Sequence, residues 1–101
     1  MLARVARYEV PEDQIAAAGD AFAEAATQIE QLEGFAGGYV LVDPEDGRTM
    51  TITLWENPIA LENSERQASA ARREAAGSVG GAVLSVEKFD VAHQLGQPGS
   101  S

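Results

Sequence analysis

Hydrophobic and polar residues recur in six blocks along the chain, and each block predicts one strand or one helix. Four blocks carry Val, Leu, Ile and Tyr with a partial period of two, which is typical of strands with at least one buried face. Two longer blocks repeat apolar residues every three or four positions, which predicts amphipathic helices. The predicted strands cover residues 2–10, 35–43, 48–56 and 82–91, and the predicted helices cover residues 11–33 and 57–76.

Residues that cap helices or form turns separate these blocks. Pro11 opens the first helix, and Gly34 ends it. The segment Asp-Pro-Glu-Asp-Gly at residues 43–47 is turn chemistry, so the strands on either side of it form a β-hairpin. Asn57 with the following proline starts the second helix, and Gly77 terminates it.

The order of elements is therefore β-α-β-β-α-β, which predicts an α+β fold of the ferredoxin-like type. Right-handed crossovers place both helices on one face of a four-stranded antiparallel sheet. A chain of 101 residues supports one core, so we expect a single domain over residues 1–91 and a flexible tail over residues 92–101. The apolar stripe of the first helix consists of Ile15, Ala18, Phe22, Ala25, Ile29 and Leu32, and that of the second of Leu61, Ala68, Ala71 and Ala75.

The two faces of the sheet differ in composition. In the third strand, Met50, Ile52 and Leu54 alternate with Thr49, Thr51, Thr53 and Trp55, and we expect the aliphatic set to face the helices. The other residues expected toward the helices are Ala3, Val5, Leu84 and Val86. The phase of the second strand stays open, because Tyr39 and Leu41 alternate with Val40 and Val42, and that of the last strand could also be reversed.

The open face is expected to carry several aromatic and polar side chains. They are Arg4, Tyr8, Thr51, Thr53, Trp55, Glu87 and Phe89. An uncovered sheet face with large aromatic residues predicts association, and a second copy of the same sheet is the simplest cover.

Composition and charge narrow the function classes. The chain has no cysteine, which excludes disulfides and thiolate metal sites, and its net charge of −9 disfavours nucleic acid and anionic membranes. It shows neither a membrane-spanning apolar run nor a secretory leader, so we expect a cytoplasmic protein. Ten acidic residues and no basic one stand between Tyr8 and Gly47. They predict a solvated helix face, with a docking surface for a basic partner as the alternative.

Three features resemble the dimeric α+β barrel superfamily and, within it, the antibiotic-biosynthesis-monooxygenase-like domains. They are Leu-Glu-Gly-Phe-Ala-Gly-Gly-Tyr at residues 32–39, Thr-Leu-Trp-Glu-Asn at residues 53–57 followed by Ala60 and Leu61, and the βαββαβ spacing over residues 1–91. The resemblance implies a homodimer whose sheets pack face to face, with a pocket between sheet and helices in each protomer. It implies a small aromatic or polyketide-like ligand and, for an enzyme, a monooxygenase without metal or organic cofactor. A non-catalytic dimeric stress-related or ligand-sensing module is the alternative.

The candidate site residues follow from their chemistry and from this resemblance. Arg4 and Tyr8 are the candidate catalytic residues, because a guanidinium and a phenol can stabilise an oxyanion. Arg4 and Arg7 lie on opposite faces of one strand, so one could enter the pocket while the other forms an ion pair, for example with Glu87. The candidate substrate-binding residues are Trp55, Tyr39, Thr53 and Phe89. Trp55 could instead be a packing anchor.

Two further predictions exclude a function. His93, the only histidine, lies in the tail and is not expected to act in catalysis. The haem-degrading branch of the family uses an Asn on the first strand and a Trp and a His on the second helix. Here Ser64 and Glu74 stand near those helix positions and the strand has no Asn, so haem degradation is not expected.

Overall fold

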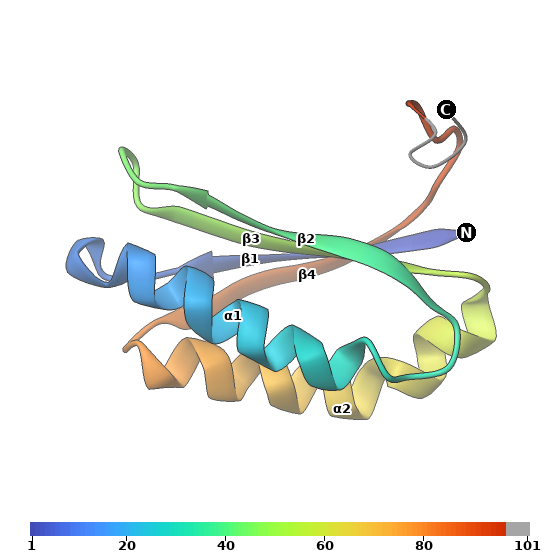
Figure 1. Cartoon of the computed structure of the whole chain (residues 1–101), viewed down its shortest axis with the longest axis horizontal. Helices are drawn as coiled ribbons and strands as arrows, with labels where there is room; N and C mark the ends of the chain where they lie inside the picture. The colour runs from blue at the N-terminus through green and yellow to red at the C-terminus, as the bar shows by residue number, and fades with distance from the viewer. Residues whose placement is uncertain (97–101) are drawn as a thin grey trace.

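Two helices lie together on one face of a four-stranded antiparallel sheet in the computed structural model, which describes residues 1–96 (Figure 1). The strands are ordered β2-β3-β1-β4 across the sheet. The chain order βαββαβ and the α+β fold are therefore confirmed. The elements are β1 (Leu2–Glu9), α1 (Ile15–Ile29), β2 (Phe35–Asp43), β3 (Arg48–Trp55), α2 (Pro58–Ser78) and β4 (Ala82–Asp90).

The helix boundaries differ from the predicted ones mainly in α1. Pro11 is followed by a 3-10 turn, Glu12–Gln14, and the α-helix begins only at Ile15. The helix ends at Ile29, but Leu32 still packs against the core. At the start of α2, the Asn57 side chain accepts a hydrogen bond of 2.8 Å from the main-chain N–H of Ala60, as expected of a helix cap.

Two clusters of buried side chains fill the layer between sheet and helices. In one, the rings of Tyr8 and Phe22 lie with their centroids 4.1 Å apart. In the other, Trp55 packs edge-on against Phe35 at 5.6 Å. The predicted stripe of α2 is buried throughout, at Leu61, Ala68, Ala71 and Ala75.

The prediction of which side chains face the helices was wrong for β1 and β3. Arg4, Ala6 and Tyr8 point toward the helices and are buried. They pair across the strands with Thr53, Thr51 and Thr49 of β3, which share their face. Ala3, Val5, Met50, Ile52 and Leu54 therefore belong to the open face. A shift of one residue exchanges the two faces of a strand, and alternation alone does not say which set turns inward.

The outer strands show a partly different outcome. In β2, Val40 packs against the core, whereas Tyr39 points to the open face, so the phase left open by the sequence is settled. In β4, Glu87 and Phe89 share the open face with their β1 partners, as expected. Leu84 is 61% exposed, contrary to the expectation that it faces the helices. The reason is a register shift of β4 opposite Arg7 and Tyr8, which interrupts the alternation.

Residues 1–96 contain no helix with the length and apolar character needed to cross a membrane. The predicted flexible tail begins within this range, but its residues 97–101 lie outside the described part of the chain.

Candidate functional site

A cavity of about 410 Å³ lies between α1 and the face of the sheet that the helices cover. This volume falls within the usual range of small-molecule sites. Its apolar walls include Phe22, Ile29, Phe35 and Val40, and its polar lining includes Arg4, Tyr8, Thr51, Thr53 and Arg72. A few polar groups thus converge within a mostly apolar enclosure.

Arg4, on the inner strand β1, brings a positive charge to this cavity. Only 2% of the residue is exposed. Its Nη2 donates hydrogen bonds to the main-chain oxygen of Leu61 at 2.9 Å and to Ser64 Oγ at 3.1 Å. The same nitrogen lies 2.8 Å from Glu65 Oε2. Burial lowers the pKa of Arg4 and the Glu65 carboxylate opposes this, but an arginine keeps its charge at neutral pH.

Arg72 places a second guanidinium at the same cavity. It is buried on α2, and its Nη2 donates to Glu65 Oε1 at 3.2 Å. Glu65 therefore lies between two guanidinium groups, since its other oxygen contacts Arg4. The carboxylate side chain is 41% exposed, so solvent reaches this ion pair on one side.

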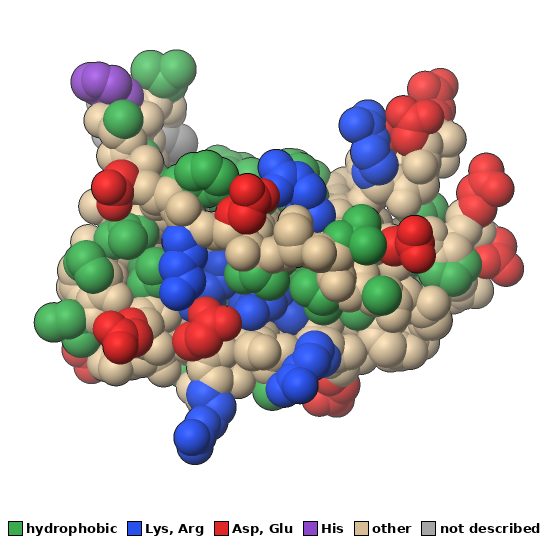
Figure 2. Space-filling model, turned by 180° about the vertical axis from the view of Figure 1, so that it is seen from behind, with side chains coloured by type: hydrophobic (Ala, Val, Ile, Leu, Met, Phe, Trp, Pro, Cys, Tyr) green, Lys and Arg blue, Asp and Glu red, His purple; other side chains and the backbone are tan. Residues whose placement is uncertain are grey.

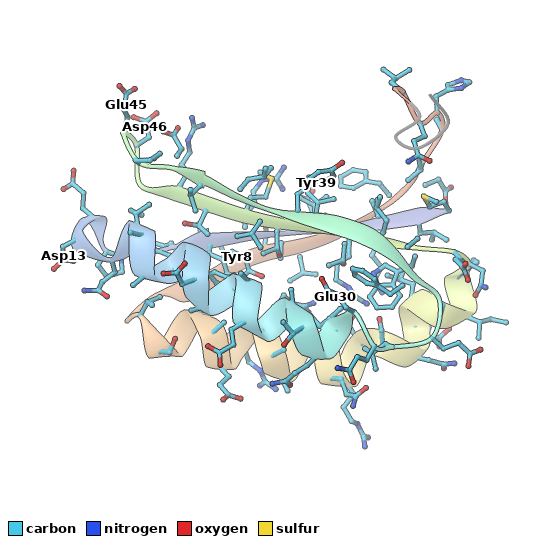
Figure 3. The ribbon with its side chains drawn as sticks, in the orientation of Figure 1. Tyr8, Asp13, Glu30, Tyr39, Glu45 and Asp46 are labelled. Carbon is cyan, nitrogen blue, oxygen red and sulfur yellow. The ribbon has the colours of Figure 1, made fainter. Side chains whose placement is uncertain are left out.

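Tyr8 lies between the sheet and α1 (Figure 3). Its hydroxyl shares a hydrogen bond of 2.9 Å with Thr51 Oγ1. Burial raises the pKa of Tyr8 above its ordinary value, and the hydrogen bond to Thr51 and the charges of Arg72 and Arg4 only partly oppose this. The phenol is therefore neutral at neutral pH, where it can donate a hydrogen bond but is no ready base.

The structure brings some of the predicted site residues together and separates others. Arg4, Tyr8 and Thr53 line the cavity. Tyr39 borders it from β2, but its side chain points to the open face of the sheet (Figure 3). Phe89 lies on that open face too, outside the cavity lining.

Trp55 lies behind the cavity rather than in its wall. Its side chain is 0% exposed, and its Nε1 donates a hydrogen bond of 3.0 Å to Thr53 Oγ1. The centre of the Arg4 guanidinium lies 5.6 Å from the centroid of the indole ring. Trp55 therefore supports two cavity residues, and its packing alternative is the one that the geometry favours. The other alternative is also resolved: Arg7, not Arg4, forms the ion pair with Glu87.

Sequence reasoning missed Arg72, Glu65 and Ser64. The signal was present in part, because Ser64, Ala68 and Arg72 follow one another at intervals of four and so share one helix face. Polar members of an Ala-rich stripe are easily assigned to solvent. Of the two positions compared with haem degraders, Ser64 is the buried partner of Arg4, and Glu74 is exposed.

Charge is unevenly distributed over the outer surface. Figure 2 shows basic side chains gathered near the middle of one face, whereas acidic side chains lie mostly along its margins. At the tip of the β2–β3 hairpin, Arg48 pairs with Asp43 and Asp46. Several basic side chains thus lie close together on one face of a protein whose net charge is −9.

Comparisons with known proteins agree with this fold. Residues 1–76 match the family described as antibiotic biosynthesis monooxygenase. A candidate antibiotic biosynthesis monooxygenase from Deinococcus radiodurans has a TM-score of 0.75 at 14% identity, covering 95% of this chain and 97% of that one. The haem degrader MhuD from Mycobacterium tuberculosis has a TM-score of 0.72 at 23% identity, covering 95% and 100%.

The cofactor-independent oxygenase SnoaB from Streptomyces nogalater is a third similar structure. Its TM-score is 0.66 at 18% identity, and the match covers 93% of this chain and 95% of that one. A comparison with curated protein sequences finds no match. At these identities the solved structures establish the shared fold.

Proposed function

The chain belongs to the antibiotic biosynthesis monooxygenase family, and we propose that it is a homodimer that binds a small aromatic or polyketide-like molecule and oxidises it with O₂ without a cofactor. The observation that carries this proposal is the cavity beneath the sheet. Arg4, Tyr8 and Thr53 converge there within apolar walls, which is the usual construction of a small-molecule site.

The chemistry uses the electrons of the substrate. A substrate with an acidic CH₂ group next to an aromatic ring loses a proton to water and becomes an electron-rich anion. The anion gives electrons to O₂ and forms a C–O bond, which produces a peroxide anion. The peroxide takes back the proton released in the first step, and the resulting hydroperoxide loses water. In sum, CH₂ and O₂ become C=O and H₂O. The charge of Arg4 favours the anion, and the Tyr8 hydroxyl donates to the oxygen that gains charge. The apolar walls exclude water from these intermediates.

The open face of the sheet supports the homodimer. No helix within residues 1–96 covers this face (Figure 1), and it carries large exposed side chains such as Tyr39, which is 61% exposed, Leu41 and Phe89. A face of four strands and eight residues measures roughly 500 Å². Two such faces together bury at least about 1,000 Å², which reaches the size of a specific interface.

A charge placed on this open face tests the dimer. We expect the unmodified protein to show twice the protomer mass of 10.6 kDa by light scattering at micromolar concentration. Leu41→Glu should shift the mass toward one protomer, because it buries an unpaired carboxylate in the interface. Ile59→Glu adds the same charge at an exposed position on α2 and serves as the matched control. A mass of one protomer for the unmodified protein contradicts the dimer.

Oxygen uptake tests the reaction. The protein is mixed with a panel of phenols and anthrones, and consumption of O₂ is compared with that of the Tyr8→Phe variant, which keeps the ring packed against Phe22. We expect turnover by the unmodified protein and about a hundredfold to thousandfold loss in the variant, in line with the loss of one oxyanion donor. Absence both of turnover and of any ligand-induced rise in melting temperature would contradict the proposal.

A non-catalytic ligand-binding module is the second candidate, and one observation favours it. No histidine lines the cavity within residues 1–96, and Tyr8 is neutral at neutral pH, so the described cavity offers no ready general base. A panel compound that raises the melting temperature without consuming O₂ would identify this second function.

A further inference from the structure

We infer that the cavity is built for an anionic aromatic ligand, a planar acid whose carboxylate is held by Arg72 and Arg4, and that Glu65 limits the strength of this preference. The inference rests on the binding part of the proposed function and names its ligand class. It is carried by the charges and by the hydrogen-bond donors that lie against the cavity.

The charges at the inner end of the cavity do not cancel. Arg4 and Arg72 share the single carboxylate of Glu65, so this cluster holds one unmatched positive charge. Glu30, at the end of α1, is the only acidic residue that lines the cavity in the described chain, and it is exposed to solvent. Its charge is therefore screened by water, whereas the guanidinium groups are buried.

The hydrogen bonds of Arg4 are also incomplete. Its Nη2 donates hydrogen bonds to Leu61 and Ser64 and forms an ion pair with Glu65. Its Nε and Nη1 are buried without a hydrogen-bond partner. Glu65 Oε2 is the one acceptor of this cluster that is buried without a hydrogen bond, against two unpaired donor nitrogens of Arg4. Buried donors are nearly always paired, so the cluster has more free donors than acceptors and also lacks negative charge. A carboxylate supplies both, because each oxygen accepts hydrogen bonds and the group carries the missing charge.

The remaining walls define the rest of the ligand. Phe22, Ile29, Phe35 and Val40 form an apolar surface beside the two guanidinium groups. An aromatic ring is flat and apolar and can lie against such walls while its acid group meets the cations. One unmatched positive charge matches a monoanion, and the net charge of −9 on the whole chain disfavours ligands with several negative charges.

A matched pair of probes tests the charge preference without any mutation. 2-Naphthoate and 2-naphthamide have nearly the same shape and differ in charge. We expect calorimetry at pH 7 and physiological ionic strength to show at least about tenfold tighter binding of the acid, the contribution of one charge-assisted contact. Equal binding of both probes, or tighter binding of the amide, overturns the inference.

Substitutions on one helix assign the preference to its residues. Arg72→Gln should weaken 2-naphthoate binding about tenfold and leave 2-naphthamide unchanged, because it removes the anchoring charge. Glu65→Gln should strengthen binding of the acid, because it removes the competing carboxylate. Arg73→Gln removes the same charge from an exposed position of the same helix and is the matched control. An equal loss in Arg73→Gln and Arg72→Gln would show that only the overall field acts, and would refute the anchor.

These outcomes separate the inference from the proposed function. Oxygen uptake with neutral phenols, together with equal binding of acid and amide, retains the oxygenase and removes the anion preference. Binding of neither naphthalene probe also overturns the inference, and the oxygen-uptake panel then decides the proposed function on its own. The acid-to-amide ratio of the unmodified protein keeps the test decisive even if a variant at the cluster fails to fold.

Discussion

Trp55 is expected to contribute more to the stability of the fold than to the binding of any ligand. It is the only tryptophan of the chain, and its side chain is fully buried at the end of β3. It packs edge-on against Phe35 and donates a hydrogen bond to Thr53. Replacing it by alanine removes these contacts at once and leaves a hole beneath the Arg4 guanidinium.

The magnitude follows from the burial of the indole. A tryptophan side chain buries roughly 200 Å². At about 25 cal/mol per Å² this corresponds to about 5 kcal/mol of transfer free energy, of which alanine retains a small part. Trp→Ala substitutions in cores cost about 3–5 kcal/mol, in agreement with this figure. For a domain of this length, the melting temperature should fall by at least about 12 °C.

Urea denaturation followed by far-ultraviolet circular dichroism is the suitable assay, because Trp55→Ala removes the only indole fluorophore. Protein concentration is held constant, since the stability of a dimer depends on it. Ile59→Ala, a substitution at a side chain that is 70% exposed, is the control and should change the unfolding free energy by about 0.5 kcal/mol or less. A Trp55→Ala variant that is equally stable but binds ligand poorly would refute this reasoning and place the indole in the site.

Three further predictions concern the backbone at two glycines, the dependence of stability on pH, and the C-terminal tail. Gly34→Ala should lower the unfolding free energy by more than about 1 kcal/mol, because φ is +84° at this position and the new Cβ would meet Ala60. Gly77→Ala should raise the unfolding free energy by about 0.5–1 kcal/mol, because this glycine lies within α2 and its new Cβ would meet open space. Thermal melts compare the two variants. The raised pKa of Tyr8 predicts stability that is complete below the unfolded tyrosine pKa of about 10 and declines as pH rises through the folded value. Tyr8→Phe should remove part of this decline in alkaline denaturation, and an unchanged profile would contradict the burial argument. Truncation after residue 92 should shift the melting temperature by about 3 °C or less, because the described residues that it removes, 93–96, are exposed. A larger fall would show that the tail docks.

Local sequence patterns were sufficient to predict the helices and strands of this fold. Pro11, the turn at residues 43–47 and the cap at Asn57 act through backbone geometry within a few residues, so their effects can be read directly from the sequence. The predicted strands agree with the observed ones to within one residue at their ends. The order βαββαβ then restricts the topology, because crossovers are right-handed and sequential strands tend to pair.

The face of each strand depended on contacts that lie far apart in the sequence. Alternation in β3 separates Met50, Ile52 and Leu54 from the threonines and Trp55, but both sets are apolar enough to be covered. The inward set was decided by what the helices offer: Leu61, Ser64 and Glu65 of α2 supply acceptors for Arg4 from about sixty positions away.

Only some residues of the candidate site could therefore be predicted from the sequence. The chemistry of Arg4 and Tyr8 could be inferred from their residue types. The role of Arg72 and Glu65 depends on their contacts beside β1, which form only when α2 packs against that strand. A guanidinium at the edge of an Ala-rich stripe is an ordinary surface group until tertiary structure removes it from water. Burial, which strengthens its interaction with a neighbouring charge, is a property of the packed layer and not of the local chain.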